Sequence, residues 1–537
     1  MAKPRIMFDT DARHPLIYMY EPPMQKEEYE SAVDEITGTP VEGLTFSLGD
    51  TQSLLHDSKV GGMWGEGINR WPHIIWKRAR QNADALIADG NDPLKIICDR
   101  AREKGILIYP SIFVQQGGRE RFIESWIDEK QGNEFSKTGG AGFKARMKDL
   151  HIGSVGDMDP DDPATNCYDF KHAEIRNERS ALIQETLNNY EIDGLELHLS
   201  YTPYYFHPNN IESGRKIMTS WISDIYERVK TSNKDRELIV RIPTNINSCI
   251  SIGLDPVEWI RSGIVDAIVA EPLNTIDPMA DFRPLVQASK GSECRIIAGL
   301  PAGVVSDRQG TASIEVIRAA ACNYWAQGID GIYLTGWYGS WPYTPRFYAK
   351  LREVAHPDIM APKDKYYVLP TTGGRVKPMA NETLQLPLNL DVDVPASVTL
   401  EISDDLPLWN SKGRVHEVLL RIRLSHNTEI DKVEFKLNGT KLPEKSLRKI
   451  NELYRMTGPR MGGGAGSGYW NIFRLEKEYW PVKGKNTIEF TLLKRDPHVL
   501  PSPTVHFVEL ETRYLMGKNF HRSFVDSDLG PYDGPEG

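Results

Sequence analysis

Short runs of β-forming residues recur along the first two thirds of the chain, and many of them end at Gly, Pro, Asp or Asn. In DGLELHLS (193–200), leucines alternate with polar residues that include Glu196 and His198, which is the period of a pleated strand. Helix-like segments separate the runs, and DPVEWIRSG begins with Asp255 as a capping residue and Pro256 at the first helical position. The runs predict strands at residues 16–23, 43–50, 105–113, 193–200, 237–243, 265–274, 294–302 and 330–337.

Strand and helix alternate eight times over roughly 330 residues, which is typical of a (β/α)8 barrel. A doubly wound open sheet is the structural alternative, but no Gly-x-Gly-x-x-Gly turn follows the first predicted strand. The connections after the second and third strands are long. In a barrel, the connections at the carboxyl ends of the strands build the active site, so we expect functional residues there.

The pattern changes after about residue 355. Residues 356–385 are rich in proline and turn-forming residues and are predicted to connect two domains. Alternating strands such as TVHFVELETRYL follow and predict an antiparallel β-sandwich over residues 386–516, with an accessory role. The acidic residues 517–537 are predicted to be disordered. The first domain, residues 1–355, is the predicted catalytic barrel.

Composition mainly excludes classes of protein. With 40% hydrophobic and 26% charged residues, the 537-residue chain is typical of a globular protein with more than one domain. A net charge of -10 argues against nucleic acid as a partner, and no apolar run approaches the ~20 residues of a membrane span. The five scattered cysteines form neither a metal-site spacing nor a disulfide framework, and no cofactor is expected. No signal peptide is visible, which fits a cytoplasmic protein, or a periplasmic or secreted one whose leader was trimmed. The oligomeric state is not predicted.

Two glutamates occur on predicted strands that lie two apart in the barrel. Glu196 is on the polar face of the fourth strand, and Glu271 ends the sixth. Cleavage of a glycosidic bond needs one carboxyl group to protonate the leaving oxygen and another to attack the anomeric carbon or activate water. The alternatives are a structural ion pair between Glu196 and Arg241, and a carboxylate at a loop entry for Glu271. We interpret the two as a catalytic pair; the distance between them, which separates retention from inversion, is not predicted.

Aromatic residues gather in the connections after the second, fourth and eighth predicted strands. Flat rings pack on the apolar faces of sugars while a few polar groups orient them, although any single ring can instead anchor a loop. The aromatic residues of these connections are Trp64, Trp71, Tyr201, Tyr204, Tyr205, Trp337, Tyr338 and Trp341. The residues predicted to bind the substrate are His198, Arg241, Trp64, Tyr201, Trp337, Asn245, His56 and Lys59.

Two further ligand questions stay open at this stage. A basic pocket would suit a uronate or a sulfated sugar, although exposed lysines and arginines are usually just solvated. Its members would be His56, Lys59, Arg70, His198, His207 and Arg241. Aspartates in GDMDPDDP (156–163) offer oxygen ligands to calcium, but their spacing is not that of a calcium-binding hand and favours a turn.

The order DGLELHLS, VRIPTN…GLDPVEWIRSGIVDAIVAEP and GIDGIYLTGWY resembles the family-10-like glycosyl hydrolases. These are barrel proteins of polysaccharide-degrading bacteria that often carry a C-terminal β-domain. The resemblance covers residues 14–350 and is clearest over 190–340. The placement of the acids is also similar to the α-galactosidase clan, which implies Glu196 as the nucleophile and Glu271 as the acid/base. That clan uses aspartates, however, and retaining β-glycosidases instead pair strands four and seven.

The resulting hypothesis is a glycoside hydrolase that cleaves a poly- or oligosaccharide through Glu196 and Glu271. Two other functions remain open. One is a barrel that binds carbohydrate without cleaving it. The other is a lyase acting on a uronate-containing polymer, with His198 or Tyr201 as its base.

Overall fold

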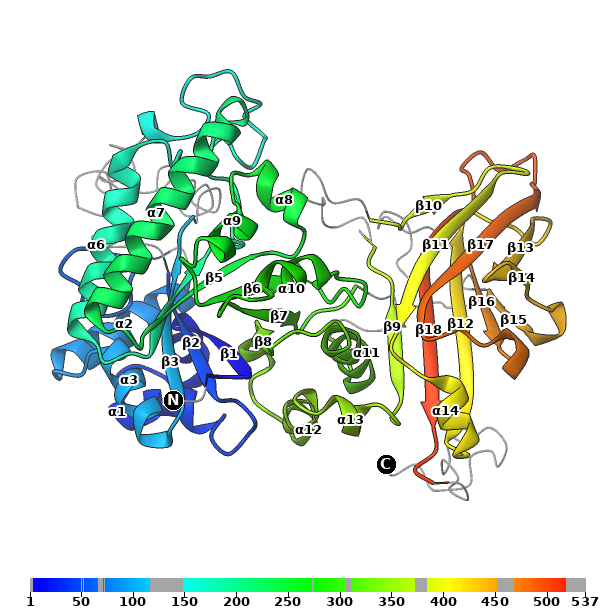
Figure 1. Ribbon diagram of the computed structural model, residues 1–537, viewed down its shortest axis with the longest axis horizontal. Coiled ribbons are helices and arrows are strands. Elements are labelled where there is room, and N and C mark those ends of the chain that lie inside the picture. The colour runs from blue at the N-terminus through cyan, green and yellow to red at the C-terminus, as the bar shows by residue number, and fades with distance from the viewer. Residues whose placement is uncertain are drawn as a thin grey trace. The chain divides into compact units, whose positions relative to one another are not determined.

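The computed structural model describes residues 3–49, 51, 53–65, 71, 73–115, 148–272, 275–305, 311–371, 384–451 and 468–517. The chain divides into two compact units. One contains a closed barrel of parallel strands surrounded by helices, and the other contains two antiparallel sheets (Figure 1). The predicted combination of a (β/α)8 barrel and a β-sandwich is confirmed.

The barrel closes from its first strand to its eighth, and every neighbouring pair of strands is parallel. The strands are β1 (Ile6–Asp11), β2 (Gly43–Gly49), β3 (Leu107–Phe113), β4 (Gly194–His198), β5 (Glu237–Pro243), β6 (Ala267–Glu271), β7 (Arg295–Pro301) and β8 (Gly331–Thr335). Inward-facing side chains fill the middle of the barrel. They are Met7, Tyr109, Ile239, Ala267, Val269, Ile297 and Tyr333.

Helices connect the strands along the chain. The longer ones are α1 (Lys26–Asp34), α2 (Ile74–Ala88), α3 (Pro93–Lys104), α6 (Ala173–Asn189), α7 (Ile211–Ser232), α8 (Ile246–Ser251), α9 (Pro256–Arg261), α10 (Arg283–Ser289), α11 (Ile314–Trp325) and α12 (Pro345–Val354). Short helical turns are η1 (Pro15–Met19), η3 (Lys148–Leu150), η4 (Pro208–Asn210) and η5 (Trp337–Ser340). The predicted start of α9 is confirmed, because the Asp255 side chain accepts a hydrogen bond from the Glu258 amide and Pro256 follows it.

The predicted first strand, residues 16–23, is wrong, whereas the other seven are confirmed to within a few residues. Residues Pro15–Met19 form the helical turn η1, and the true strand is Ile6–Asp11. Its sequence, IMFDTD, has the alternation of a strand, but carboxylates occupy part of the face that a barrel buries. Those carboxylates lower the hydrophobicity of the run, so the more apolar LIYMY segment was the stronger match to a strand.

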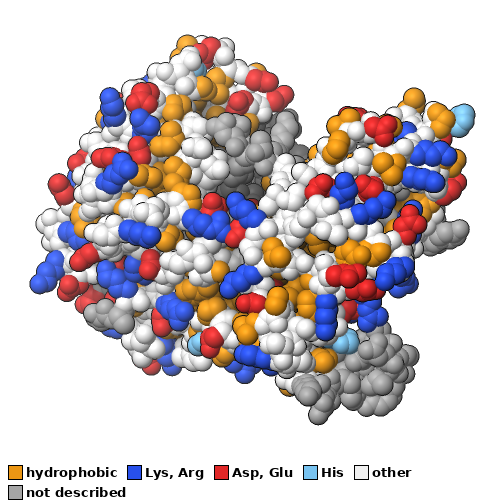
Figure 2. All heavy atoms as spheres, turned by 45° about the vertical axis from the view of Figure 1, so that its right-hand side comes forward, with side chains coloured by type: hydrophobic (Ala, Val, Ile, Leu, Met, Phe, Trp, Pro, Cys, Tyr) orange, Lys and Arg blue, Asp and Glu red, His pale blue; other side chains and the backbone are white. Residues whose placement is uncertain are grey.

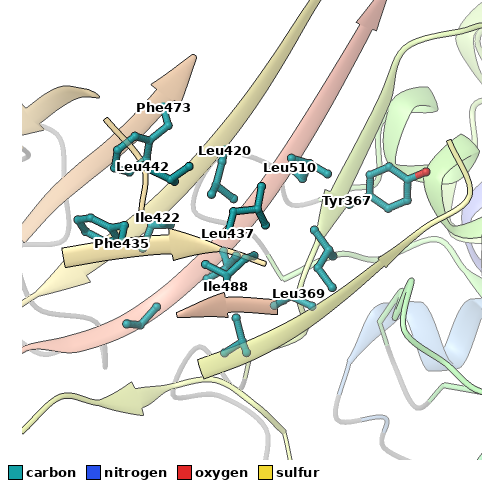
Figure 3. Close-up of a cluster of buried hydrophobic side chains, with 14 of the residues drawn as sticks. Tyr367, Leu369, Leu420, Ile422, Phe435, Leu437, Leu442, Phe473, Ile488 and Leu510 are labelled. Carbon is teal, nitrogen blue, oxygen red and sulfur yellow. The ribbon is translucent and has the colours of Figure 1, made fainter. Parts of the chain in front are cut away.

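The sandwich packs its core between two sheets. One has the order β10-β18-β12-β16-β15, with β9 also paired to β18, and the other has the order β11-β17-β13-β14. Leucine, isoleucine and phenylalanine side chains from both sheets point toward one another (Figure 3). The strands are β9 (Lys365–Val368), β10 (Leu388–Asn389), β11 (Pro395–Ile402), β12 (Val415–Ser425), β13 (Lys432–Leu437), β14 (Thr440–Lys441), β15 (Leu447–Asn451), β16 (Gly468–Arg474), β17 (Gly484–Lys494) and β18 (Thr504–Tyr514).

The second unit also contains part of the predicted connector and several helical elements. The helical elements are α11, α13 (Pro357–Met360), α14 (Leu406–Ser411), η6 (Glu444–Ser446) and η8 (Lys477–Tyr479). Strand β9 lies in the segment predicted to be a connector and hydrogen-bonds to β18. The predicted disordered tail lies outside the described residues from residue 518 onward.

Charged side chains of both signs are interspersed over the surface that Figure 2 displays. All five cysteines lie within the described residues, where they are buried and form no disulfide, as small apolar side chains would. Among the helices that the structure describes, none is both long enough and apolar enough to cross a membrane.

Candidate active site

A single guanidinium group lies among three carboxyl groups at the carboxyl end of the barrel. Arg241 on β5 is almost fully buried. Its Nη2 lies 2.9 Å from Glu271 Oε2 on β6, and its Nη1 lies 3.5 Å from Asp9 Oδ2 on β1 and 3.8 Å from Glu196 Oε1 on β4. The two glutamates that the sequence pairs are therefore joined through one cation, together with an aspartate that the sequence analysis did not select.

Glu271 is surrounded by hydrogen-bond donors. Besides Arg241, its carboxylate accepts hydrogen bonds from Ser200 Oγ and, at 3.1 Å, from Thr335 Oγ1, while His198 Nε2 lies 3.5 Å away. Burial by itself would raise the pKa of Glu271, but Arg241 and His198 outweigh burial and hold this pKa well below its usual range. Glu271 is thus ionised at neutral pH.

Glu196 has the opposite environment. Its side chain is 0% exposed, and Oε1 accepts hydrogen bonds from Ser111 Oγ at 2.6 Å and Tyr333 Oη at 3.1 Å. Within the described part of the chain, Oε2 has no hydrogen-bond partner. Burial raises the pKa of Glu196 to about 7, with Arg241 opposing the rise and Asp9 adding to it. Glu196 therefore keeps its proton to a higher pH than an ordinary glutamate does.

His198 lies next to Glu271, and two aromatic rings pack against His198. Phe113, at the end of β3, is 5.0 Å from the His198 ring and stacks on Tyr201 at 4.2 Å between centroids. Burial and Arg241 lower the pKa of His198 to about 4, against the opposing effect of Glu271. The imidazole is neutral at pH 7, and its Nδ1 has no partner among the described residues. The structure thus places His198 beside Glu271 and Tyr201 beside His198.

Strand β1 supplies residues that sequence reasoning missed. Asp9 and Asp11 both extend from its carboxyl-terminal half, and Asp11 accepts hydrogen bonds from Arg13 Nε at 3.1 Å and Nη2 at 3.0 Å. Asp11 is close enough to Tyr338, in η5, to raise the pKa of that phenol, after the larger effect of burial. The alternation in IMFDTD was the signal that could have identified these two aspartates. It was overlooked because the first strand was predicted at residues 16–23.

Tyr333 was also missed, because a tyrosine within a predicted strand is usually a packing residue. Its ring lies in the middle of the barrel, and its hydroxyl lies 2.6 Å from Thr45 Oγ1. The same hydroxyl accepts a hydrogen bond from Arg241 Nη1 at 3.1 Å and donates one to Glu196. Tyr333 therefore fixes the relative positions of Arg241 and Glu196.

Three predicted substrate-binding residues after β2 lie in other surroundings. Trp64 is buried and donates a hydrogen bond from Nε1 to a backbone carbonyl of α2. His56 is buried with its ring 6.1 Å from Tyr190, and Lys59 is exposed and pairs with Asp57 at 2.5 Å. In the described part of the molecule, no recorded contact joins these three residues to the glutamates.

Two further predicted residues have structural contacts at the strand ends. The Trp337 indole is only 2% exposed and donates a hydrogen bond from Nε1 to the Leu300 carbonyl at 2.8 Å. Asn245 caps α8, because its Oδ1 accepts a hydrogen bond from the Ser248 amide at 3.0 Å. Trp337 therefore has almost no exposed ring surface, whereas Tyr201 and Tyr338 are half-buried at the same end of the barrel.

The structure describes some of the residues considered for an anionic sugar and for calcium. His207 pairs with Asp157 at 3.2 Å, and Arg70 lies outside the described residues. In residues 156–163, Asp159 and Asp162 accept hydrogen bonds from backbone amides of their own turns. Over the described ranges, no three His, Cys, Asp or Glu side chains are grouped so that they could hold a metal ion.

Comparison with known proteins adds little to this geometry. Neither protein-family profiles nor curated sequences match the chain. Among solved structures, an α-L-fucosidase isoenzyme 2 from Paenibacillus thiaminolyticus is similar at 12% identity and a TM-score of 0.43, over 67% of this chain and 50% of that one. An α-amylase from Geobacillus thermoleovorans, complexed with acarbose, has 12% identity and a TM-score of 0.37, over 90% and 98%.

A cycloisomaltooligosaccharide glucanotransferase from Paenibacillus sp. has 9% identity and a TM-score of 0.35. It is matched over 94% of this chain but 57% of its own length, so this chain spans little more than half of that enzyme. Likeness at these levels of identity and TM-score does not indicate an activity for this chain.

Proposed function

We propose that this chain is a glycoside hydrolase whose barrel cleaves a poly- or oligosaccharide with Glu196 and Glu271. One observation carries the proposal. Two carboxyl groups share Arg241 at the carboxyl end of a barrel, yet their surroundings shift their pKa values in opposite directions. A pair of carboxyl groups held in different protonation states is what glycosidic cleavage requires.

The environments suggest a role for each glutamate. Glu271 is the ionised member and would attack the anomeric carbon or take a proton from water. Glu196 is the protonated member of the pair and would be the source of the proton that the leaving oxygen needs. This assignment reverses the roles that the likeness to the α-galactosidase clan implies. It rests on the ion pair between Glu271 and Arg241, and on the unpartnered Oε2 of Glu196 among described residues.

The charges of the described residues favour an uncharged sugar over an anionic one. Arg241 is engaged by carboxylates, Arg13 is paired with Asp11, and His198 is neutral at pH 7. None of these groups is available to bind a uronate or a sulfate without giving up a carboxylate partner. Tyr201 offers a half-buried ring for packing against the sugar. The proposed division of labour places catalysis in residues 1–355 and an accessory role in residues 386–516.

The test is a screen of the wild-type protein against neutral, uronate-containing and sulfated polysaccharides and aryl glycosides. New reducing ends without ultraviolet absorbance are expected from wild type, and Glu271→Gln should lower the rate at least 1,000-fold. Glu237→Gln, at the opposite end of the barrel, is the matched control and should remain active. Unsaturated, ultraviolet-absorbing products would indicate a lyase instead, and binding without cleavage a carbohydrate-binding protein.

A further inference from the structure

The proton on Glu196 has no direct route to a substrate. The side chains that share Arg241 are exposed to different extents: 13% for Asp9, 6% for Glu271 and 0% for Glu196. A general acid must come within hydrogen-bond reach of the oxygen that it protonates. Glu196 holds a proton but is sealed from solvent, so a more exposed group has to complete the transfer. This inference rests on the hydrolase activity proposed above.

Asp9 lies where such a group is needed. Asp9 lies on the inward face of β1, between Met7 and Asp11. Met7 belongs to the barrel core, and the Asp11 side chain is 17% exposed. The backbone amide of Gly336 lies close enough to lower the pKa of the Asp9 carboxyl group, against the larger effect of burial. Asp9 Oδ2 and Glu196 Oε1 both approach the same nitrogen, Nη1 of Arg241. Asp9 is therefore electrostatically coupled to Glu196 and also reaches the open end of the site.

We propose that Asp9 is the catalytic acid, and that Asp9 and Glu196, which both approach Arg241 Nη1, carry a single proton as a pair, one of them being protonated while the other is ionised. As the glycosidic C–O bond breaks, the proton moves from Asp9 to the leaving oxygen, and the leaving sugar departs as an alcohol. Water then supplies the oxygen that binds to the anomeric carbon. One proton of that water returns to the Asp9–Glu196 pair, which restores the starting state.

The charges around Asp9 support a shared proton. The groups that face Asp9 are Arg241 on β5, Glu196 on β4, Glu271 on β6, Asp11 on β1, and the phenols Tyr333 on β8 and Tyr338 in η5. Burial raises the pKa of Asp9, against Arg241, and the charges of Glu271 and Asp11 add to the rise. With Glu271 ionised, two more full negative charges beside one guanidinium would be unfavourable, so protonation of one relieves the repulsion.

Asp11 is the obvious competitor, and its contacts argue against it. The Arg13 guanidinium donates hydrogen bonds to both carboxylate oxygens of Asp11, and the Arg13 backbone amide donates another to Oδ1. Although burial alone would raise the pKa of Asp11, these contacts lower it. Asp11 is therefore an ionised residue that orients Arg13, and Asp9 is the aspartate of this strand that can release a proton.

The test compares leaving groups in wild type and Asp9→Asn. Loss of a general acid matters when the leaving oxygen is basic and matters little when it is already stable as an anion. For Asp9→Asn, kcat/KM should fall about 1,000-fold on an unactivated oligosaccharide and less than about tenfold on the matching 2,4-dinitrophenyl glycoside. Added azide should restore part of the rate, and the basic limb of the pH profile should flatten.

Matched variants separate the possible outcomes. Glu237→Gln removes a barrel carboxylate from the opposite end and should show no contrast between leaving groups. Equal losses of Asp9→Asn on both substrates, or wild-type activity on both, would overturn the role of Asp9 while Glu271→Gln still tests the proposed hydrolase. If Asp9→Asn does not fold, Asp9→Ser serves in its place. Absence of all cleavage by wild type would contradict the proposed function and this inference together.

Discussion

The two ends of the barrel each bury carboxylate and arginine side chains, but they balance charge differently. At the amino end, Glu237 receives Arg295 Nη2 at 3.0 Å, Lys3 Nζ at 2.8 Å and the Tyr109 hydroxyl at 2.9 Å. At the carboxyl end, one guanidinium, that of Arg241, lies within 4 Å of three carboxyl groups. The amino end thus has an excess of cations around its carboxylate, whereas the carboxyl end has an excess of carboxylates.

The difference shows where the fold accepts an unfavourable arrangement. Burial would raise the pKa of Glu237, but Arg295 and Lys3 outweigh it and lower this pKa, so the amino end is stabilised by ionisation. At the carboxyl end, Glu196 is stabilised by keeping its proton. Unfavourable groups that a fold retains tend to mark functional sites, and barrel enzymes place these sites at the carboxyl end. The comparison therefore favours a stabilising role for the amino end of the barrel and a chemical role for its carboxyl end.

The same substitution at both arginines tests this comparison, and the larger effect is expected for Arg241→Met. Removing the guanidinium that these three buried carboxyl groups share should lower the free energy of unfolding by about 4 kcal/mol at pH 7. The loss should shrink at pH 5, because the carboxyl groups can then take up protons. Urea unfolding at both pH values measures it. A loss that does not depend on pH would mean that the three groups are not coupled through this cation.

The proton on Glu196 predicts a smaller effect, in the pH dependence of stability. The folded protein has a Glu196 pKa of about 7 against an ordinary value of 4.5, so it keeps a proton that the unfolded chain releases. The free energy of unfolding should therefore fall as the pH rises from 5 to 8. Relative to Glu196→Gln, the wild-type decrease should be larger by about 3 kcal/mol. Parallel pH curves for the two proteins would show that Glu196 does not titrate in this range.

The smallest effect is expected at the amino end. Arg295→Met leaves Glu237 with Lys3 and Tyr109, and Lys3 is close to half exposed, so the loss should be about 2 kcal/mol. Activity per folded molecule should stay within twofold of wild type, because the substitution lies at the end of the barrel opposite the site. Unfolding curves and initial rates on the same samples check both expectations. A large drop in rate with intact folding would contradict the separation of the two ends.

The periodic parts of the chain made most of the fold predictable. DGLELHLS alternates cleanly, and DPVEWIRSG carries its own cap, so β4 and α9 follow from local rules. The strand IMFDTD was missed because Asp9 and Asp11 replace the apolar residues on which strand recognition depends. The residues proposed for the chemistry are thus the ones that made this strand difficult to predict.

Only some of the residues that meet at the candidate site could be predicted from the sequence. Glu196, His198, Arg241 and Glu271 follow from strand ends and meet in the structure. Asp9 could not be paired with them from sequence, because the shear of the barrel decides which inward side chains meet across it. Trp64, His56 and Lys59 belong to a long connection after β2, where spacing along the chain does not predict distance from the site.

The proposed hydrolase needs Glu196 to be protonated at a pH at which Glu271 is ionised. Infrared spectroscopy of protein labelled with carbon-13 at the glutamate carboxyl groups measures this difference, with Glu196→Gln and Glu271→Gln as reference proteins. At pH 6 we expect a protonated glutamate band that Glu196→Gln lacks and Glu271→Gln retains, and that disappears with a midpoint at about pH 7. A band absent from wild type at pH 6, or one lost in Glu271→Gln instead, would show that Glu196 does not hold this proton.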